Sequence, residues 1–145
     1  MGYRTCGKWV IKGPADVVRT AWAAARLEVE PFKPDERVAT DPAVFDDFTV
    51  YFIKLGAGEV GYIRFEFDDW KWYSSYPDIQ FYERVWDYLS EVEGLTGKRV
   101  HIGEDNAIDE AAFGDDCIEL YANNLASRGF SKEQIFQALD TLEKN

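Results

Sequence analysis

Apolar and polar residues alternate most strictly over residues 60–67, where Ile63, Phe65 and Phe67 fall on one side of an extended chain. Alternation with a period of two is typical of a strand that buries one face. Residues 48–55 are rich in β-branched and aromatic side chains, and a Gly-Ala-Gly sequence joins the two segments. Together they predict a β-hairpin.

A short strand and a helix are predicted before this hairpin. Residues 9–11 mark the strand, and Gly13 followed by Pro14 stops it. Pro14 is well placed as the first helical residue, because a helix start does not need the N–H that proline lacks. Small and apolar residues then recur at helical spacing over residues 15–27, which predicts an amphipathic helix.

A second helix and a further strand are predicted after the hairpin. Ser75 is placed to cap the helix, Pro77 lies in its first turn, and Asp78 completes a capping box with Ser75. An apolar stripe at helical spacing continues to about Gly94. Residues 98–102 then have the composition of a strand.

The predicted order over residues 1–103 is strand, helix, strand, strand, helix, strand. This is the order of the split βαβ arrangement in ferredoxin-like folds. We therefore expect an α+β chain with a ferredoxin-like βαββαβ core, in which a four-stranded antiparallel sheet carries two helices on one face. The length of 145 residues is close to the commonest size of one domain, so a single domain is expected.

Residues 104–145 are expected to add an acidic loop and a C-terminal helical extension to this core. The loop covers residues 103–116, and residues 117–126 fit a helix or a fifth strand equally well. Ser131 and Gln134 have the spacing of a second capping box, and apolar residues follow at helical spacing. A helix is therefore expected from about residue 132 to residue 143.

Negative charge is the main compositional feature. The chain has 27 acidic and 16 basic residues, a net charge of −11 and a pI near 4.5. Residues 101–145 hold 10 acids and 3 bases. Binding to nucleic acid or to an anionic membrane relies on Lys and Arg, so the composition disfavours both and favours a partner with a basic surface. Ordinary solubility would also explain an acidic composition.

Cysteine use and the N-terminal residues favour the cytoplasm. Cys6 and Cys117 lack the CxxC spacing of metal and redox motifs and are expected to be small apolar groups in a reducing compartment. The first residues have no apolar signal-peptide core, and no stretch approaches 18 apolar residues. Nothing in the sequence calls for a cofactor or a metal.

Three short segments look like landmarks: Met1-Gly2-Tyr3-Arg4, Asp69-Trp70-Lys71-Trp72-Tyr73 before Tyr76-Pro77-Asp78, and Ile102-Gly103-Glu104-Asp105. They resemble a family of small uncharacterised proteins of tailed bacteriophages. Those proteins begin with a Gly-Tyr-Arg-Ser-like segment, and this chain has Thr5 in place of the usual serine. The likeness covers residues 1–6 and 60–116. The resemblance implies a phage origin and the host cytoplasm. It supplies no catalytic residues, because the family has no assigned activity.

The acidic residues between positions 104 and 119 are the first candidate for chemistry. Seven acids and no base lie in this stretch, and hard cations prefer such oxygen ligands. An EF-hand loop needs acids or amides at alternate positions, and residues 105–110 break that spacing. A solvated acidic loop or an electrostatic contact surface is therefore favoured over a cation site.

His101 is the only histidine in the sequence and is therefore considered as a general base. It lies in a predicted strand without a nearby Ser or Cys nucleophile, which favours a packed or surface residue over a catalytic one. No phosphate-binding loop, GxSxG, HExxH or Walker pattern occurs. The sequence thus favours a binding role over catalysis.

Aromatic residues beside charged ones are the second candidate. Trp70, Trp72 and Tyr73 follow the strand over residues 60–67, and the two tryptophans share a face unless a bulge intervenes at Asp68 and Asp69. One sheet face cannot bury all three rings, and exposed Trp and Tyr beside charges are typical of interface hot spots. The alternative is that the C-terminal elements cover the second face and make these rings part of the core.

RNA binding through the sheet is disfavoured. RNA-recognition modules combine sheet aromatics with basic residues. The predicted central strand carries Glu66, Asp68 and Asp69 instead.

We therefore expect a small phage accessory protein that binds a basic surface of a host or defence protein. A sharper form is an inhibitor whose carboxylates occupy a nucleic-acid groove in place of phosphates. The alternatives are a divalent-cation-dependent enzyme that uses carboxylates of residues 104–119, and a self-associating structural protein; a monomer and a homodimer both remain open. The expected binding residues are Trp70, Trp72, Tyr73, Glu104, Asp105, Asp109, Asp115 and Asp116.

Overall fold

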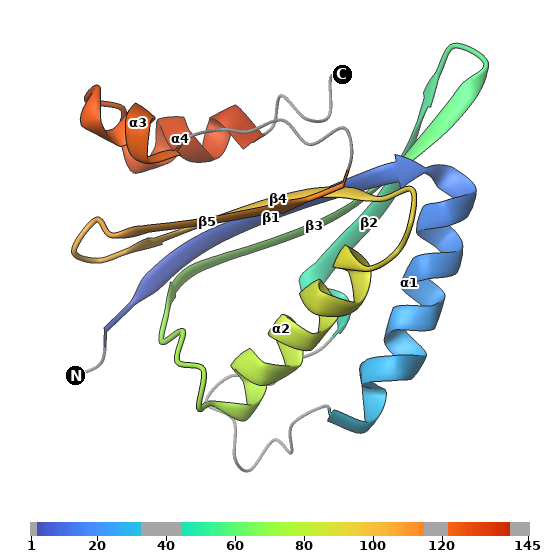
Figure 1. Ribbon diagram of the computed structural model, residues 1–145, viewed down its shortest axis with the longest axis horizontal. Coiled ribbons are helices and arrows are strands. Elements are labelled where there is room, and N and C mark those ends of the chain that lie inside the picture. Colours follow the sequence, from blue (N-terminus) through green and yellow to red (C-terminus); the bar gives the residue numbers. More distant parts are fainter. Residues whose placement is uncertain (1–2, 33–44, 115–121, 140–145) are drawn as a thin grey trace.

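A computed structural model of the chain describes residues 3–32, 45–114 and 122–139 (Figure 1). The strands and helices follow in this order: β1 Thr5–Pro14, α1 Ala15–Val29, β2 Phe48–Leu55, β3 Gly58–Trp70, α2 Pro77–Ser90, β4 Thr96–Gly103, β5 Ile108–Phe113, α3 Ala122–Ser127 and α4 Lys132–Leu139. Short 3-10 turns lie at Glu30–Phe32 and Phe45–Asp47. All five strands form one antiparallel sheet in the order β2-β3-β1-β4-β5. The predicted α+β class is confirmed.

The sheet is covered on both faces. α1 and α2 lie on one face, and α3 and α4 lie on the other (Figure 1). Because successive side chains of a strand point to opposite faces, each strand supplies two apolar layers. The helix-side core, under α1 and α2, includes Trp9, Ile11, Phe65, Phe81 and Leu89. The α4-side core consists of Val10, Tyr62, Val100, Ile102, Ile135 and Leu139.

β1 lies in the middle of this arrangement. Trp9, Val10 and Ile11 are each fully buried, although they point alternately to the two faces. A strand that is covered on both sides is apolar at successive positions rather than at every second one. This explains the continuous apolar run that marked the first strand in the sequence.

The sheet has five strands rather than the four that the sequence predicted. Residues 108–113, expected to belong to an acidic loop, form β5 and pair with β4 from Ile102↔Ile108 to Gly97↔Phe113. Charged side chains at Asp109 and Glu110 concealed this strand, and Glu110 forms an ion pair with the buried Lys98 of β4. The four-stranded ferredoxin-like order therefore does not describe the whole sheet.

The capping box predicted at the start of α4 is confirmed. The Ser131 N–H donates to Gln134 Oε1 at 2.7 Å, and the Gln134 N–H donates to Ser131 Oγ at 3.2 Å. The sequence predicted a helix as far as residue 143. The structure describes α4 as far as Leu139, and residues 140–145 lie outside the described part. Of residues 117–126, those from Ala122 onward are helical in α3, and residues 115–121 are likewise outside the described ranges.

Two predicted helix starts are wrong in detail. α2 begins at Pro77 after Tyr76, and no side-chain cap is made, so Ser75 is not its N-cap. Instead, Asp78 Oδ1 accepts the N–H of the next residue, Ile79, at 3.0 Å. Pro14 is the last residue of β1 and precedes α1, with an extended backbone, rather than being its first helical residue. Both prolines still fix the chain direction where a helix starts.

A β-bulge interrupts β3 near its end. The pairing with β1 runs Gly7↔Phe67 and then Thr5↔Trp70, so three steps along β3 match two along β1. Within this step Asp69 adopts a left-handed φ of 62°. The extra residue moves Trp70 to the helix side, where its ring packs against Phe67 with the centroids 5.4 Å apart.

No helix in the described part of the chain is both long enough and apolar enough to cross a bilayer.

Asp69→Val is expected to lower the free energy of unfolding by about 1–2 kcal/mol, because a β-branched residue is strained at positive φ. Asp69→Gly should change it by less than about 0.5 kcal/mol, since glycine adopts this conformation without strain. Urea unfolding measures both. Asp109→Val on β5 is the matched control at an exposed strand position without positive φ. Equal losses for Asp69→Val and Asp109→Val would contradict a strained bulge.

Candidate functional site

The aromatic segment and the acidic turn of the sequence meet at one end of the sheet. Thr5, at the start of β1, pairs with Trp70 at the end of β3 and with Gly103 at the end of β4. Tyr3 precedes this point and joins the two segments. The Tyr3 N–H donates to the Tyr73 hydroxyl, and the Tyr3 hydroxyl donates to Asp105 Oδ1.

We call this surface the acidic end and define it by Tyr3, Tyr73, Glu104, Asp105 and Asp109. The three acids are exposed, Tyr3 is 37% exposed, and Tyr73 is partly buried. The ring of Tyr73 also meets the ring of Tyr76 edge-on at 5.1 Å. Four of the five members were predicted binding residues, and Tyr3 is the one that the sequence analysis missed.

The backbone of the turn between β4 and β5 holds Asp105 in place. Glu104 N–H donates to the Arg4 carbonyl at 2.9 Å, and Asp105 Oδ1 also accepts the Ala107 N–H at 3.0 Å. Gly103 allows Tyr3 to lie close, because an added Cβ would stand only 1.6 Å from the Tyr3 hydroxyl oxygen. The hydrogen bonds from Tyr3 and from Ala107 lower the pKa of Asp105, so its carboxyl group stays ionised.

Trp70 and Trp72 are less exposed than a pair of interface anchors would be. Both are partly buried and pack against the helix-side core. The Trp72 ring stacks on Phe67 with centroids 4.3 Å apart and meets the edge of His101 at 5.0 Å. Most of each indole is therefore used within the fold. The predicted residues Asp115 and Asp116 lie outside the described ranges.

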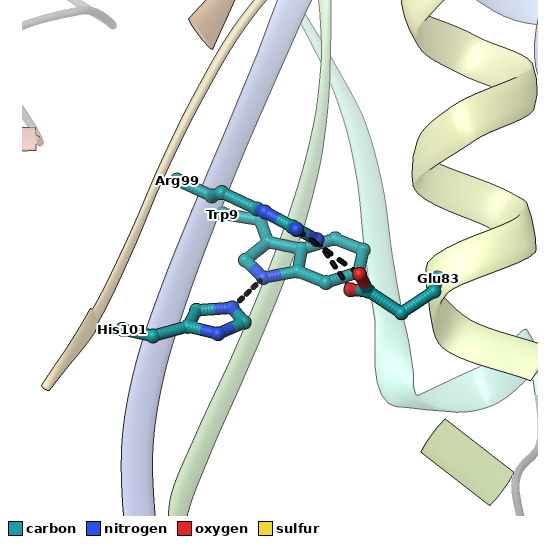
Figure 2. A network of polar contacts seen from close by, with 4 residues as sticks. All are labelled: Trp9, Glu83, Arg99 and His101. Atoms are coloured by element: carbon teal, nitrogen blue, oxygen red, sulfur yellow. Dashed lines mark hydrogen bonds and ion pairs between the residues drawn. The ribbon is translucent and has the colours of Figure 1, made fainter. Parts of the chain in front are cut away.

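A polar network lies inside the helix-side core (Figure 2). Trp9 Nε1 donates to His101 Nε2 at 2.8 Å. Arg99 forms two contacts with Glu83, at 2.5 and 3.1 Å, and its guanidinium carbon lies 5.1 Å from the ring centre of Trp9 and 4.7 Å from that of Trp86. Arg99 is thus paired with a carboxylate and packed against indole rings.

His101 occupies the packed position that the sequence analysis favoured. Its side chain is 5% exposed, and burial, followed by the charge of Arg99, lowers its pKa from 6.5 to about 3. The imidazole is therefore neutral near pH 7, and the Nε2 lone pair is used by Trp9. These features suit a hydrogen-bond acceptor in the core and do not suit a general base.

A groove with a volume of about 520 Å³ lies on the face of the sheet that α4 covers, between β1, β3 and α4. Cys6 opens into it, and its thiol donates to Asp68 Oδ1 at 2.7 Å and accepts from Lys132 Nζ at 3.5 Å. Burial and then the hydrogen bond to Asp68 raise the pKa of the Cys6 thiol. The thiol is protonated near pH 7 and is a poor nucleophile.

Metal binding has no support among residues 3–32, 45–114 and 122–139, which contain no group of three or more His, Cys, Asp or Glu placed to hold an ion. Glu104, Asp105 and Asp109 are included in this statement. Asp115, Asp116 and Glu119 are not, because they lie outside those ranges. The cation-dependent alternative therefore depends on the latter acids.

No family model, curated protein or solved structure matches this chain. The resemblance to phage proteins stays a prediction from the three quoted segments.

The neutral His101 makes stability depend on pH in a defined window. Below about pH 6.5 the unfolded chain takes up a proton on this histidine, whereas the folded chain does so only near pH 3. Stability therefore falls by about 1.4 kcal/mol per pH unit as the pH drops from 6.5 toward 3.

His101→Gln keeps an acceptor for Trp9 but does not titrate. Between pH 7 and pH 5 the wild type should lose about 2 kcal/mol more than this variant in urea unfolding. Parallel pH curves for the two proteins would refute a neutral, buried His101.

Proposed function

We propose that this chain is a protein-binding protein that recognises a basic surface of its partner through the acidic end. The observation that carries the proposal is the hydrogen-bonded chain from Tyr73 through Tyr3 to Asp105. It fixes aromatic rings beside exposed carboxylates before any partner arrives. Rings that are already ordered lose little entropy on binding, and this favours affinity.

Charge supports a basic partner. Glu104, Asp105 and Asp109 place three negative charges close together at one end of the sheet, in a chain whose net charge is −11. Such a surface attracts a basic partner during diffusion and disfavours acidic ones. Two side chains that could serve catalysis are poorly suited to it, because His101 accepts a hydrogen bond from Trp9 and burial raises the pKa of the Cys6 thiol.

The narrower form of the proposal is inhibition. The partner would be a nucleic-acid-binding protein of a host or of a defence system, and the carboxylates would lie where phosphates normally bind. The acids on the β4–β5 hairpin support this form, because a hairpin presents them on a fixed backbone. Phage origin and action in the host cytoplasm rest on the sequence resemblance and on cysteine use.

We also propose that residues 5–103 correspond to a ferredoxin-like unit that β5 extends at one edge. The support is that β1 lies between β3 and β4, all neighbours are antiparallel, and α1 and α2 share a face. In this interpretation the added strand and its turn carry the exposed acids of the acidic end. The strand that extends the ferredoxin-like unit would then also carry part of the proposed binding surface.

The triple variant Glu104→Gln, Asp105→Asn, Asp109→Asn is expected to lose binding to a basic partner by about tenfold or more, since each exposed charge contributes up to about 1 kcal/mol. Protein captured from infected host lysate by wild type and variants is quantified by mass spectrometry. The amount captured should also fall between about 50 and about 500 mM NaCl, because salt screens exposed charges.

The control is Asp87→Asn, Glu91→Gln, Glu93→Gln, which removes the same charge from exposed positions near the other end of the sheet. It should capture as much as the wild type. Equal loss in both triple variants would mean that only net charge matters, and no loss in either would refute the acidic end as the binding surface.

A further inference from the structure

The two edge strands of the sheet differ in charge. β5, at one edge, carries the acids Asp109 and Glu110, whereas the only charged residue of β2, at the other edge, is Lys54. In the described part of the chain, β3 is the only strand neighbour of β2. An edge strand leaves about half of its backbone N–H and C=O groups without a strand partner. The β2 edge therefore offers backbone hydrogen bonds with little charge beside them.

β2 lacks the features that usually prevent an edge strand from pairing, which are short length, prolines, bulges and several charges. Its eight residues include no proline, and its register with β3 runs without a bulge from Phe48↔Phe65 to Leu55↔Gly58. Residues 54–58 are exposed, and Figure 1 shows the turn of the β2–β3 hairpin projecting past α1. A long, regular and mostly apolar edge of this kind is suited to accept another strand.

The side chains of β2 are apolar on both faces of the sheet. Val50 and Phe52 pack at the border of the helix-side core, and Tyr51 and Ile53 pack at the border of the α4-side core. These four side chains are only partly buried, whereas those in the middle of the inner strand β1 are fully buried. A further strand beside β2 would therefore bury more apolar area on both faces at once.

We infer that β2 pairs in antiparallel orientation with β2 of a second copy of this chain. The pair is two-fold symmetric and joins two five-stranded sheets into one. Residues 49–53 are all β-branched or aromatic, so every cross-strand neighbour in the middle of the pair is of a type that stabilises sheets. The antiparallel orientation also places the two Lys54 side chains at opposite ends of the pair, where they do not face each other.

Charge selects a second copy over the basic partner of the proposed function. The only charged residue of β2 is a base, so this edge does not attract a basic strand. The net charge of −11 opposes self-association, but pairing at β2 puts the two β5 edges at the far sides of the joined sheet. With strands about 4.8 Å apart, these edges are roughly 40 Å from each other, several times the Debye length of about 8 Å. The acidic ends therefore repel each other little in this dimer.

The dimer goes beyond the proposed function and does not rest on it. Sedimentation velocity of the full chain over a range of concentrations is expected to show a monomer–dimer equilibrium. Added NaCl should shift this equilibrium toward the dimer, because salt screens the repulsion between two acidic chains. This salt dependence is opposite to the one expected for binding of a basic partner. The triple variant of the acidic end should still form the dimer, so the two proposals can fail separately.

Two charge variants test whether β2 is the interface. Thr49→Lys with Ile53→Lys places like charges on both strands of the pair, and Thr49→Glu with Ile53→Glu does the same with the opposite sign. Each variant alone should dimerise at least about tenfold more weakly than the wild type, because like charges across a strand pair are destabilising. An equimolar mixture of the two variants should form a one-to-one heterodimer, in which lysines meet glutamates. Recovery in the mixture also shows that both variants fold.

The control is Asp109→Asn with Ala112→Lys, which changes the net charge as the lysine variant does but at exposed positions of β5. It should dimerise at least as well as the wild type. Amide hydrogen exchange of the wild type adds a test without substitutions, since about half of the amides over residues 48–54 should exchange more slowly in the dimer than in the monomer.

A monomer at every concentration would overturn the inference. So would slow exchange of all amides over residues 48–54 in the monomer, because the chain itself would then cover this edge. A dimer that only the control variant weakens would place the interface elsewhere. Oligomers that grow without limit would indicate pairing of β2 with β5 of the next copy, and this result would also overturn the symmetric dimer.

Discussion

The bulge in β3 is the constraint on which this end of the sheet depends. Side chains alternate along a strand, so one extra residue exchanges the faces of all the residues after it. Trp70 thereby joins the helix-side core beside Phe67, and the chain leaves the sheet in a direction that brings Tyr73 to Tyr3. The carbonyl of Asp69, in the same bulge, holds Arg4. One irregularity of the backbone thus accounts for the position of Trp70 in the core and for the hydrogen bond that holds Arg4.

In the described part of the chain, the buried side-chain polar atoms of the helix-side core have hydrogen-bond partners. The indole N–H of Trp9 is fully buried and would cost stability without an acceptor, and the neutral His101 provides one. Arg99 enters the same layer with Glu83 as its ion-pair partner and two indole rings beside it. Residue types that are common in active sites are therefore used by the fold. The proposed function therefore relies on the exposed acids and tyrosines of the acidic end.

The features predicted correctly from the sequence depend on neighbours close along the chain. The β2–β3 hairpin follows from alternation and a glycine-containing turn, and the capping box of α4 follows from Ser131 and Gln134, three residues apart. Features that depend on distant partners were missed. β5 is recognisable only beside β4, where Lys98 pairs with Glu110, and Tyr3 contacts Asp105 from 102 residues away. The sequence predicted that the face of the sheet on which Trp70 and Trp72 lie depends on whether a bulge occurs at Asp68 and Asp69. Alternation alone does not reveal whether a strand inserts an extra residue.

The acids near β5 also have a structural explanation, which competes with a binding role. β5 is an edge strand, and charged side chains on an edge prevent pairing with other chains. The exposed Asp109 would serve this purpose wherever a partner binds, and the net charge of −11 opposes self-association further. Edge protection does not explain Asp105, which lies in the turn beyond the strand and accepts hydrogen bonds from Tyr3 and Ala107. A carboxylate that only deters pairing needs no fixed orientation and no tyrosine beside it. The ordered position of Asp105 is therefore the feature that favours recognition over simple edge protection.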